Sequence, residues 1–354
     1  MTLSGRETSG IEQRYCDWRQ RRHLIHCLME RGVLTIYSEN GKSEPDAVRD
    51  AKDEAIWLDL IDPSPEEIET VQTLAGVRVP SREALSEIEL SSRLARDGDH
   101  LYLSTPVIGP PANGHAVPTP AGFIVGRQTL VTIRFEELPS FQGVIDRMGT
   151  DENLRTGPAV FVALLEAIVD RGADVLEHLA SGVDDLSRLV FRGDLRGSTS
   201  SSSNFTLRRA LSKVGALADK SSKARDVLLG VGRIAAFTVD VCHDVLPDGL
   251  RDQLHAVSKD VGSLSDYETH LSDKAQFLLD AVLGFITIEQ NDIFKVLTIA
   301  SVVGVPPTLL AGIWGMNFKL MPELSWDFGY PMAWSLIILS GVAPLIWFWR
   351  KGWF

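Results

Sequence analysis

The C-terminal part of this 354-residue chain contains two long apolar stretches, and they constrain its fold more than any other feature. Val296–Met316 is a run of 21 residues without a charged side chain, and Tyr330–Trp349 is a second run of 20. Each matches the ~20 residues that a helix needs to cross ~30 Å of hydrocarbon. Two such runs joined by a short loop predict a pair of membrane-spanning helices rather than a buried helix of a globular core.

Basic residues flank the two apolar stretches on one side. Lys295 precedes the first stretch, and Arg350 and Lys351 follow the second, whereas the loop 315–329 carries a single lysine against two acidic residues. By the positive-inside rule, both termini should lie in the cytoplasm and the loop outside. The start of the chain has no apolar core of the kind found in a signal peptide. We therefore expect a multi-pass protein of the cell (inner) membrane.

The first apolar stretch carries a polar stripe that the second lacks. Between Val296 and Ile313 its only polar side chains are Thr298, Ser301 and Thr308, which share one helical face roughly 80° wide at about 100° per residue. Continued at three- and four-residue spacing, this stripe runs through Asn291, Phe294, Thr298, Ser301, Val305, Thr308, Gly312 and Gly315. Hydroxyls and glycines on one face also serve helix packing in lipid. The stripe alone therefore leaves pore lining and packing both open.

The residues that follow the stripe form a specific combination of motifs. Gly315-Met316-Asn317 ends the first stretch, Met321-Pro322-Glu323-Leu324 lies in the loop, and Phe328-Gly329-Tyr330-Pro331 opens the second stretch. The combination resembles the CorA family of divalent-cation (magnesium) channels, whose two-helix membrane segment carries a Gly-Met-Asn triplet at the outer mouth of the pore. The resemblance implies a selectivity filter formed by Gly315, Met316 and Asn317, and an acidic residue of the outer loop, Glu323. It also implies a pore lining formed by Asn291, Thr298, Ser301, Thr308 and Gly312.

Magnesium chemistry is consistent with an uncharged filter. Mg²⁺ prefers octahedral oxygen ligands and gives up its water reluctantly, so rings of Asn317 amide and Gly315 carbonyl oxygens could hold the hydrated ion through its waters. Phe294, Leu297 and Val305 are candidates for an apolar gate that closes by dewetting. Passive uptake, extending to Co²⁺ and Ni²⁺, needs no ATP, since a divalent ion gains about 4.6 kcal/mol per 100 mV of inside-negative potential.

Two helices cannot enclose a pore, so several chains must each contribute one stripe. The sequence predicts a homo-oligomer, and the resemblance implies a pentamer. The expected partners are other copies of the chain, the lipid bilayer and divalent cations. No Walker-type phosphate loop and no HExxH motif occurs, so we expect a transporter rather than an enzyme, without an organic cofactor. A net charge of −12 argues against nucleic acid as a partner.

The remainder of the chain predicts a soluble α/β domain and a helical stalk. Strand-like runs alternate with short helical runs over residues 24–150, after a flexible N-terminus at 1–23. An Asp62 or Ser64 cap and Ser81 mark two helix starts, and the prolines over 110–120 mark a loop between two strands of a hairpin. Residues 157–292 read as long helices, over about 158–191, 205–243 and 250–314, the last of which continues into the pore domain at 293–354. The predicted fold class is thus an α+β membrane protein: a cytoplasmic α/β domain, a long helical stalk and two C-terminal transmembrane helices.

The resemblance also implies regulation by divalent ions bound between acidic residues of neighbouring cytoplasmic domains. The candidates here are Glu87, Asp252 and Asp260, with Mg²⁺ as the regulatory ligand. Carboxylates on a long exposed helix are also typical of an ordinary solvent-facing surface. These residues could therefore be surface residues without a metal-binding role.

Two other functions compete with a magnesium channel. The first is a zinc transporter of the related ZntB type, with or without proton coupling; Met316 and the Met-Pro-Glu-Leu run count against it. The second is a non-transporting, membrane-anchored structural or signalling protein, which would have no need of the polar stripe. The sequence leaves open which of Mg²⁺, Co²⁺, Ni²⁺ and Zn²⁺ is carried, and in which direction.

Overall fold

The computed structural model describes residues 33–38, 41–43, 55–87, 89, 93–112, 115–148, 150–191, 200–241, 246–316, 321–322 and 326–353. The predicted flexible segment 1–23 lies outside these residues. The chain divides into two compact units. The first comprises Met1–Asp185 and Val214–Ala275, and the second comprises Leu186–Lys213 and Gln276–Phe354.

The first unit is built around a mixed sheet of seven described strands, in the order β2-β1-β3-β7-β6-β5-β4. β3 and β7 are parallel, and every other neighbouring pair is antiparallel. The strands are β1 (Val33–Ser38), β2 (Gly41–Ser43), β3 (Ala55–Ile61), β4 (Leu94–Asp97), β5 (His100–Ala112), β6 (His115–Val125) and β7 (Leu130–Arg134).

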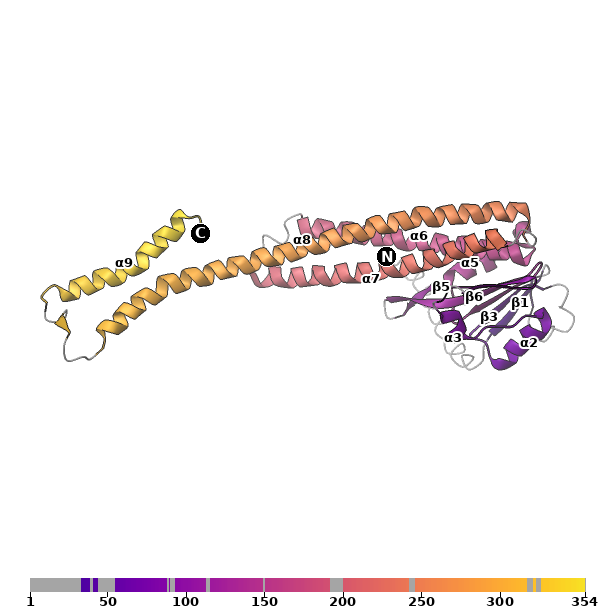
Figure 1. Cartoon of the computed structure of the whole chain (residues 1–354), viewed down its shortest axis with the longest axis horizontal. Helices are drawn as coiled ribbons and strands as arrows, with labels where there is room; N and C mark the ends of the chain where they lie inside the picture. Colours follow the sequence, from indigo (N-terminus) through magenta and orange to yellow (C-terminus); the bar gives the residue numbers. More distant parts are fainter. Residues whose placement is uncertain are drawn as a thin grey trace, which may run out of the picture. The chain divides into compact units, whose positions relative to one another are not determined.

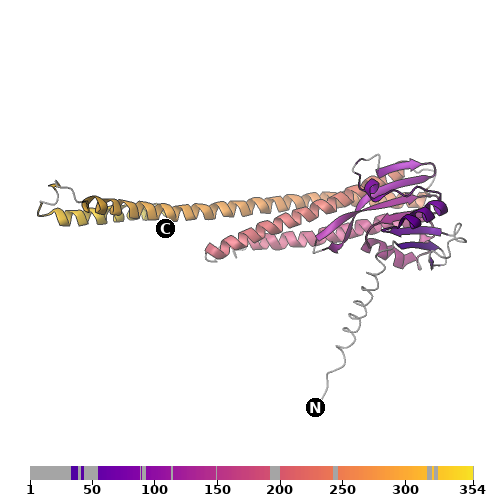
Figure 2. The same ribbon diagram turned by 90° about the horizontal axis from the view of Figure 1, so that it is seen from below.

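Helices cover both faces of this sheet (Figure 1). On one face, Val71 of α2 (Pro65–Ala75) and Leu85 of α3 (Arg82–Ser86) share an apolar cluster with Leu58 and Ile124. Figure 2 views the molecule from below, with α2 and α3 in front of the strands. Successive strand residues point to opposite faces, so each central strand contributes apolar side chains to two separate cores.

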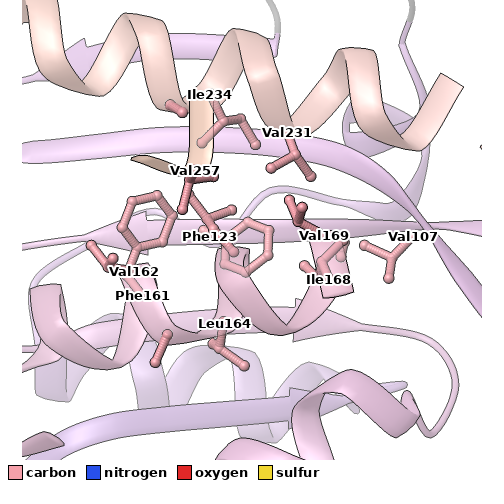
Figure 3. Packing of buried hydrophobic residues seen from close by; sticks show 14 of the residues in the cluster. Val107, Phe123, Phe161, Val162, Leu164, Ile168, Val169, Val231, Ile234 and Val257 are labelled. Atoms are coloured by element: carbon pink, nitrogen blue, oxygen red, sulfur yellow. The ribbon is translucent and has the colours of Figure 1, made fainter. Parts of the chain in front are cut away.

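The larger core lies on the other face. Phe123 of β6 stands 5.7 Å from Phe161 of α6 and 6.1 Å from Phe141 of α5, between ring centroids. Val231 of α7 and Val257 of α8 join the same cluster, and Figure 3 shows these side chains interleaved between strand and helices. The helices here are α5 (Pro139–Met148), the short η2 (Glu152–Leu154), α6 (Gly157–Phe191), α7 (Ser200–Val241) and α8 (Asp248–Trp314).

A charged network is buried in the sheet. Arg134 of β7 forms a salt bridge with Asp59 of β3 at 2.7 Å, and both side chains are almost fully buried. Thr132 donates to Asp59 at 2.6 Å and accepts from the Trp57 indole at 2.8 Å. Burial, and then the nearby Asp59 carboxylate, raises the pKa of Tyr37 to about 12. The parallel pairing of β3 with β7 places these groups side by side, so the charges are neutralised within one chain.

The local signals for short helices are confirmed. Ser64 caps α2 and forms a capping box with Glu67, whose carboxylate accepts from the Ser64 amide at 2.8 Å. Ser81 caps α3 in the same way, accepting from the Ala84 amide. Such caps satisfy amides that the first helical turn leaves unpaired.

The proline-rich segment between the strands departs from expectation. The sequence predicts a loop at Pro110–Pro120 within a hairpin, and the hairpin is present, but β5 and β6 extend through most of that segment. Pro118 pairs with Ile108, and Pro120 pairs with Pro106. β6 pairs with β7 only from Gly122 onwards, so the preceding part of β6 has a free edge, where a strand tolerates prolines.

The three long helices confirm the helical periodicity. Their observed bounds differ by a few residues from the predicted 158–191, 205–243 and 250–314. α8 is one continuous helix of 67 residues that passes through Pro306 and Pro307. Glu268 of α8 is only 1% exposed and accepts a hydrogen bond from the Ser221 hydroxyl of α7 at 2.9 Å.

The second unit contains the two apolar helices. α9 spans Gly329–Arg350, close to the predicted Tyr330–Trp349. Both α8 and α9 contain a stretch long and apolar enough to cross a membrane, and 0% and 6% of these stretches are buried within the chain. Together with the mixed sheet and the long helices, these two helices confirm the predicted fold class.

Candidate ion pathway

The polar stripe lies on the exposed surface of α8 in the second unit. All of its predicted members are exposed in the single chain, and so are the three large apolar candidates for a gate: Phe294 (63%), Leu297 (60%) and Val305 (61%). The polar and small members on the same helix are Asn291, Thr298, Ser301, Thr308 and Gly312. No described residue of the same chain covers the stripe, so it is available to water, lipid or another chain.

α9 contacts α8 on the opposite side from the stripe. A Cβ atom added at Gly341 of α9 would lie 3.4 Å from the Pro307 ring and 3.7 Å from the Val303 carbonyl. At about 100° per residue, Val303 and Pro307 lie roughly 140° and 180° around the helix from Thr298. The polar face therefore points away from the second apolar helix.

Two hollows follow the stripe. One of about 660 Å³ is lined only by residues of α8 and the turn after it, among them Val305, Thr308, Gly312 and Met316. The other, of about 460 Å³, includes Asn291, Phe294 and Thr298. The first hollow is not enclosed by the single chain, because all of its lining residues belong to the end of one helix. The predicted stripe residues are thus brought together, but as one wall of an open space.

The hydroxyl of Thr308 is oriented by its own helix. It donates to the Gly304 carbonyl at 2.8 Å. Because that bond uses the proton, the oxygen presents lone pairs, which can accept hydrogen bonds from water. A ring of such oxygens suits a hydrated cation, whose water protons point outward.

The predicted filter begins in the turn that ends α8. The Gly315 amide donates to the Ala311 carbonyl at 2.9 Å, and the Met316 amide donates to Ile313 at 3.2 Å. A Cβ atom at Gly315 would lie 3.1 Å from the Ala311 carbonyl, so the turn is tight there. The last carbonyls of a helix have no intrahelical partner and are available to a ligand. Asn317 and Glu323 lie outside the described residues.

The other end of the stripe has neighbours that sequence reasoning missed. Trp353, after α9, lines the 460 Å³ hollow together with Asp292 and Lys295. Lys295 forms a salt bridge with Asp292 at 2.8 Å. Trp353 is held back against α9 by a hydrogen bond from its amide to the Phe348 carbonyl at 3.2 Å. A chain end that folds back leaves no periodic signal in the sequence.

The predicted regulatory residues lie in the first unit. Glu87 ends α3, and Asp252 and Asp260 lie on α8; all three are exposed. Among the described residues, no three His, Cys, Asp or Glu side chains are grouped so that they could hold a metal ion. One further carboxylate bears on this region: burial, reinforced by Asp170 and Asp260, raises the pKa of the half-buried Glu166. Glu166 was not predicted from the sequence, because its electrostatic interaction with Asp260 exists only in the folded chain.

Comparisons with known proteins extend over nearly the whole chain. A profile of the family described as "CorA-like Mg2+ transporter protein" matches residues 52–351. The magnesium transport protein CorA of Pectobacterium atrosepticum is 36% identical over 302 residues, covering 84% of this chain and 92% of the relative. CorA of Escherichia coli K12 is 35% identical over the same shares.

Solved structures share the fold. The complete structure of the CorA magnesium transporter from Methanocaldococcus jannaschii matches with a TM-score of 0.72 at 18% identity, covering 92% of this chain and 99% of that one. The full-length CmaX protein matches with a TM-score of 0.65 at 17% identity, covering 91% and 96%. The extent of the profile match and the identity to the relatives establish the kinship: this chain belongs to the CorA-like Mg²⁺ transporter family.

Proposed function

We propose that this chain assembles with copies of itself into a channel that passes hydrated Mg²⁺ across the cell membrane, down the membrane potential. The observation that carries the proposal is the exposed polar stripe of α8, facing away from α9. The relatives named magnesium transport proteins, at 35–36% identity, support Mg²⁺ as the ion.

In this proposal the stripes of several chains, five by resemblance, surround one pore. The open hollows along α8 support the need for further chains, because a single helix supplies only one wall. α9 then lies between the pore helix and lipid. The loop 315–329 lies outside the cell and both termini inside, with residues 24–150 forming a cytoplasmic domain, 157–292 a stalk and 293–354 the pore domain.

The filter acts on the hydrated ion. Carbonyl oxygens of Gly315 and amide oxygens of Asn317, repeated around the ring, accept hydrogen bonds from the waters of Mg²⁺, so the ion need not shed them. Met316 spaces these two residues, and Glu323 raises the local cation concentration at the outer mouth. Thr308, Ser301 and Thr298 pass the ion onward with the same hydroxyl chemistry.

The gate is a ring of apolar side chains at Phe294, Leu297 or Val305. Each side chain is more than half exposed in one chain, and a ring of such side chains around a narrow pore excludes water. An ion that keeps its hydration shell cannot cross a dry constriction.

Mg²⁺ also acts as the regulatory ligand in this proposal. Glu87 of one chain and Asp252 or Asp260 of a neighbour supply carboxylates, and Glu166 adds negative charge near Asp260. Carboxylates from two chains would bind Mg²⁺ without any single chain holding a complete site.

Ion flux into proteoliposomes tests the proposal. The purified protein is reconstituted, an inside-negative potential is imposed, and uptake of Mg²⁺, Co²⁺, Ni²⁺ and Zn²⁺ is measured in parallel, while native mass spectrometry gives the number of chains. We expect potential-driven Mg²⁺ uptake, weaker uptake of Co²⁺ and Ni²⁺, and a ring of five. Uptake of Zn²⁺ without Mg²⁺ would point to a zinc transporter, and no uptake of any ion by intact oligomers would point to a structural role.

A further inference from the structure

A cavity of about 380 Å³ lies in the first unit, on the face of the sheet that α3 covers. β5 and β6 contribute Tyr102, Ser104 and Ile124 to its lining, and no residue of the proposed ion pathway takes part. The volume falls within the range of about 300–1,000 Å³ that is usual for small-molecule sites.

Ser104 supplies an unpaired polar group to this cavity. The side chain is 5% exposed, and its hydroxyl has no hydrogen-bond partner among the described residues. Ser104 stands opposite Gly122 in the β5–β6 ladder, and Leu85 of α3 packs so closely over Gly122 that a Cβ atom there would lie 2.7 Å from it. A buried hydroxyl normally finds a partner, so the Ser104 hydroxyl is able to hydrogen-bond a molecule that enters the cavity.

Arg78, Arg93 and Tyr102 supply hydrogen-bond donors to the cavity, while the Ser81 oxygen, also in its lining, accepts from the Ala84 amide. Arg78 and Arg93 line it, and neither takes part in a salt bridge between described residues. The Nε of Arg93 donates to the Glu87 carbonyl, which fixes the guanidinium and leaves its terminal nitrogens for another acceptor. The Tyr102 oxygen accepts from the Arg78 amide at 3.1 Å and so keeps its own proton to donate.

We propose that this cavity binds a small organic anion, a phosphorylated or carboxylated molecule. Its charged group pairs with Arg78 and Arg93, which match planar and tetrahedral oxyanions through paired N–H donors, and Ser104 donates to it from the floor. The apolar part lies against Val79 and Leu85. The site takes anions and shares no lining residue with the stripe of α8, so it does not depend on the ion that the channel carries.

Binding by the full chain in detergent tests the site. Isothermal titration calorimetry is run with three probes: inorganic phosphate, adenosine monophosphate and benzoate, in buffer free of divalent ions so that chelation does not contribute heat. We expect saturable binding of adenosine monophosphate or benzoate, with inorganic phosphate weaker because it lacks an apolar part. Which of the two organic probes binds distinguishes a phosphate ligand from a carboxylate ligand.

Variants locate the binding. Arg78→Gln and Arg93→Gln should each weaken binding of the organic probe by about tenfold or more, since each removes a charge-assisted hydrogen bond. Arg78→Gln keeps the backbone amide that donates to the Tyr102 oxygen. Arg127→Gln, which alters an exposed arginine paired with Asp99, is the matched control and should bind as wild type. Wild-type affinity in the Arg78→Gln/Arg93→Gln double variant, or no saturable binding of any probe, would overturn the proposal.

Ser104→Ala separates a ligand contact from a structural role. Its hydroxyl has no protein partner in the described chain, so the thermal midpoint of the unliganded protein should not fall, while affinity for the organic probe should fall severalfold. A lowered midpoint with unchanged affinity would mean that the hydroxyl serves the fold, and would contradict its place in the site.

Discussion

The two compact units treat charge and apolar surface in opposite ways. In the first, Asp59 and Arg134 are buried in the sheet, and each is satisfied by partners from the same chain. In the second, Val296 (68%), Trp349 (70%) and Tyr330 (76%) are largely exposed. Contiguous exposed apolar surface of this extent marks a membrane or partner interface. The buried charges of the first unit are therefore paired within one chain, whereas the second unit presents an apolar surface that suits lipid and, in our proposal, further chains.

This difference separates two kinds of substitution. A change at the buried Asp59–Arg134 pair of the first unit should act through the stability of the chain, since these two charges are paired internally. A change along the stripe of α8 should act on transport while leaving the single chain as stable as before, because the stripe makes few contacts within it. Each prediction below tests one side of that separation.

The largest effect is expected at the filter. In the proposed filter, the Asn317 amide accepts hydrogen bonds from ion-bound water. Asn317→Ala removes it, so Mg²⁺ uptake should fall below detection while the oligomer and its thermal midpoint stay unchanged. Proteoliposome flux, native mass spectrometry and thermal unfolding are measured on the same preparation. Uptake equal to wild type would exclude Asn317 from the mechanism. Loss of the oligomer would show that changes near the stripe affect assembly as well as transport.

The next effect belongs to the buried pair of the first unit. Asp59→Ala leaves Arg134 charged and unpaired, which should cost about 3–5 kcal/mol of folding free energy. The control is Asp99→Ala, which breaks a pair between Asp99 (59% exposed) and Arg127 (60% exposed) and should cost less than about 1 kcal/mol. Thermal unfolding of the two variants in detergent measures the difference; similar midpoints would refute the self-sufficiency of the first unit.

Much of the fold could be predicted from local pattern. Apolar periodicity predicted the three long helices and α9 to within a few residues, and Ser64 and Ser81 marked the starts of α2 and α3. The prolines over 110–120 led to the prediction of a loop, because a proline usually interrupts a strand unless the edge of that strand is unpaired. The edge of β6 is unpaired there because its pairing with β7 begins only at Gly122. Such pairing between distant segments cannot be seen in the local sequence.

The candidate pathway shows the same limit. Helical spacing alone predicted which residues share the stripe, since that property depends on one helix. The contact of Gly341 with Pro307, the position of Trp353 beside the stripe and the electrostatic effect of Asp260 on Glu166 join residues far apart in the sequence. Those interactions could be seen only in the folded chain.

A smaller effect is expected at the gate. Phe294→Ala should widen the proposed apolar ring, and Leu297→Asn should let water into it, so each should raise Mg²⁺ leak severalfold at high internal Mg²⁺ with the oligomer intact. Val296→Ala is the control: its side chain is equally exposed but lies on the α9 side of the helix, roughly 160° around from Thr298. Intact rings with no added leak from either variant would move the gate to Val305, and lost assembly would mean that these side chains pack between chains.

The smallest predicted effect concerns Glu166 in the first unit, where burial and then Asp170 and Asp260, opposed by Arg147, raise the carboxyl pKa above 4.5. Below pH 4.5 the group is protonated in both the folded and the unfolded chain and contributes nothing to stability. As pH rises above 4.5 the unfolded chain loses the proton first, so stability falls through the window up to the raised pKa and stays reduced at pH 7.

Glu166→Gln removes that pH-dependent cost. Its thermal midpoint should exceed that of wild type at pH 7 and equal it at pH 4, by a free energy below about 1 kcal/mol because the half-exposed side chain is screened by solvent. Glu177→Gln, an exposed change on the same helix, should shift neither midpoint. If Mg²⁺ binds near Asp260, adding it should raise the wild-type midpoint at pH 7 more than that of Glu166→Gln. A lower midpoint for Glu166→Gln than for wild type at pH 7 would mean that a partner stabilises the Glu166 carboxylate. That outcome would contradict the raised pKa of this group.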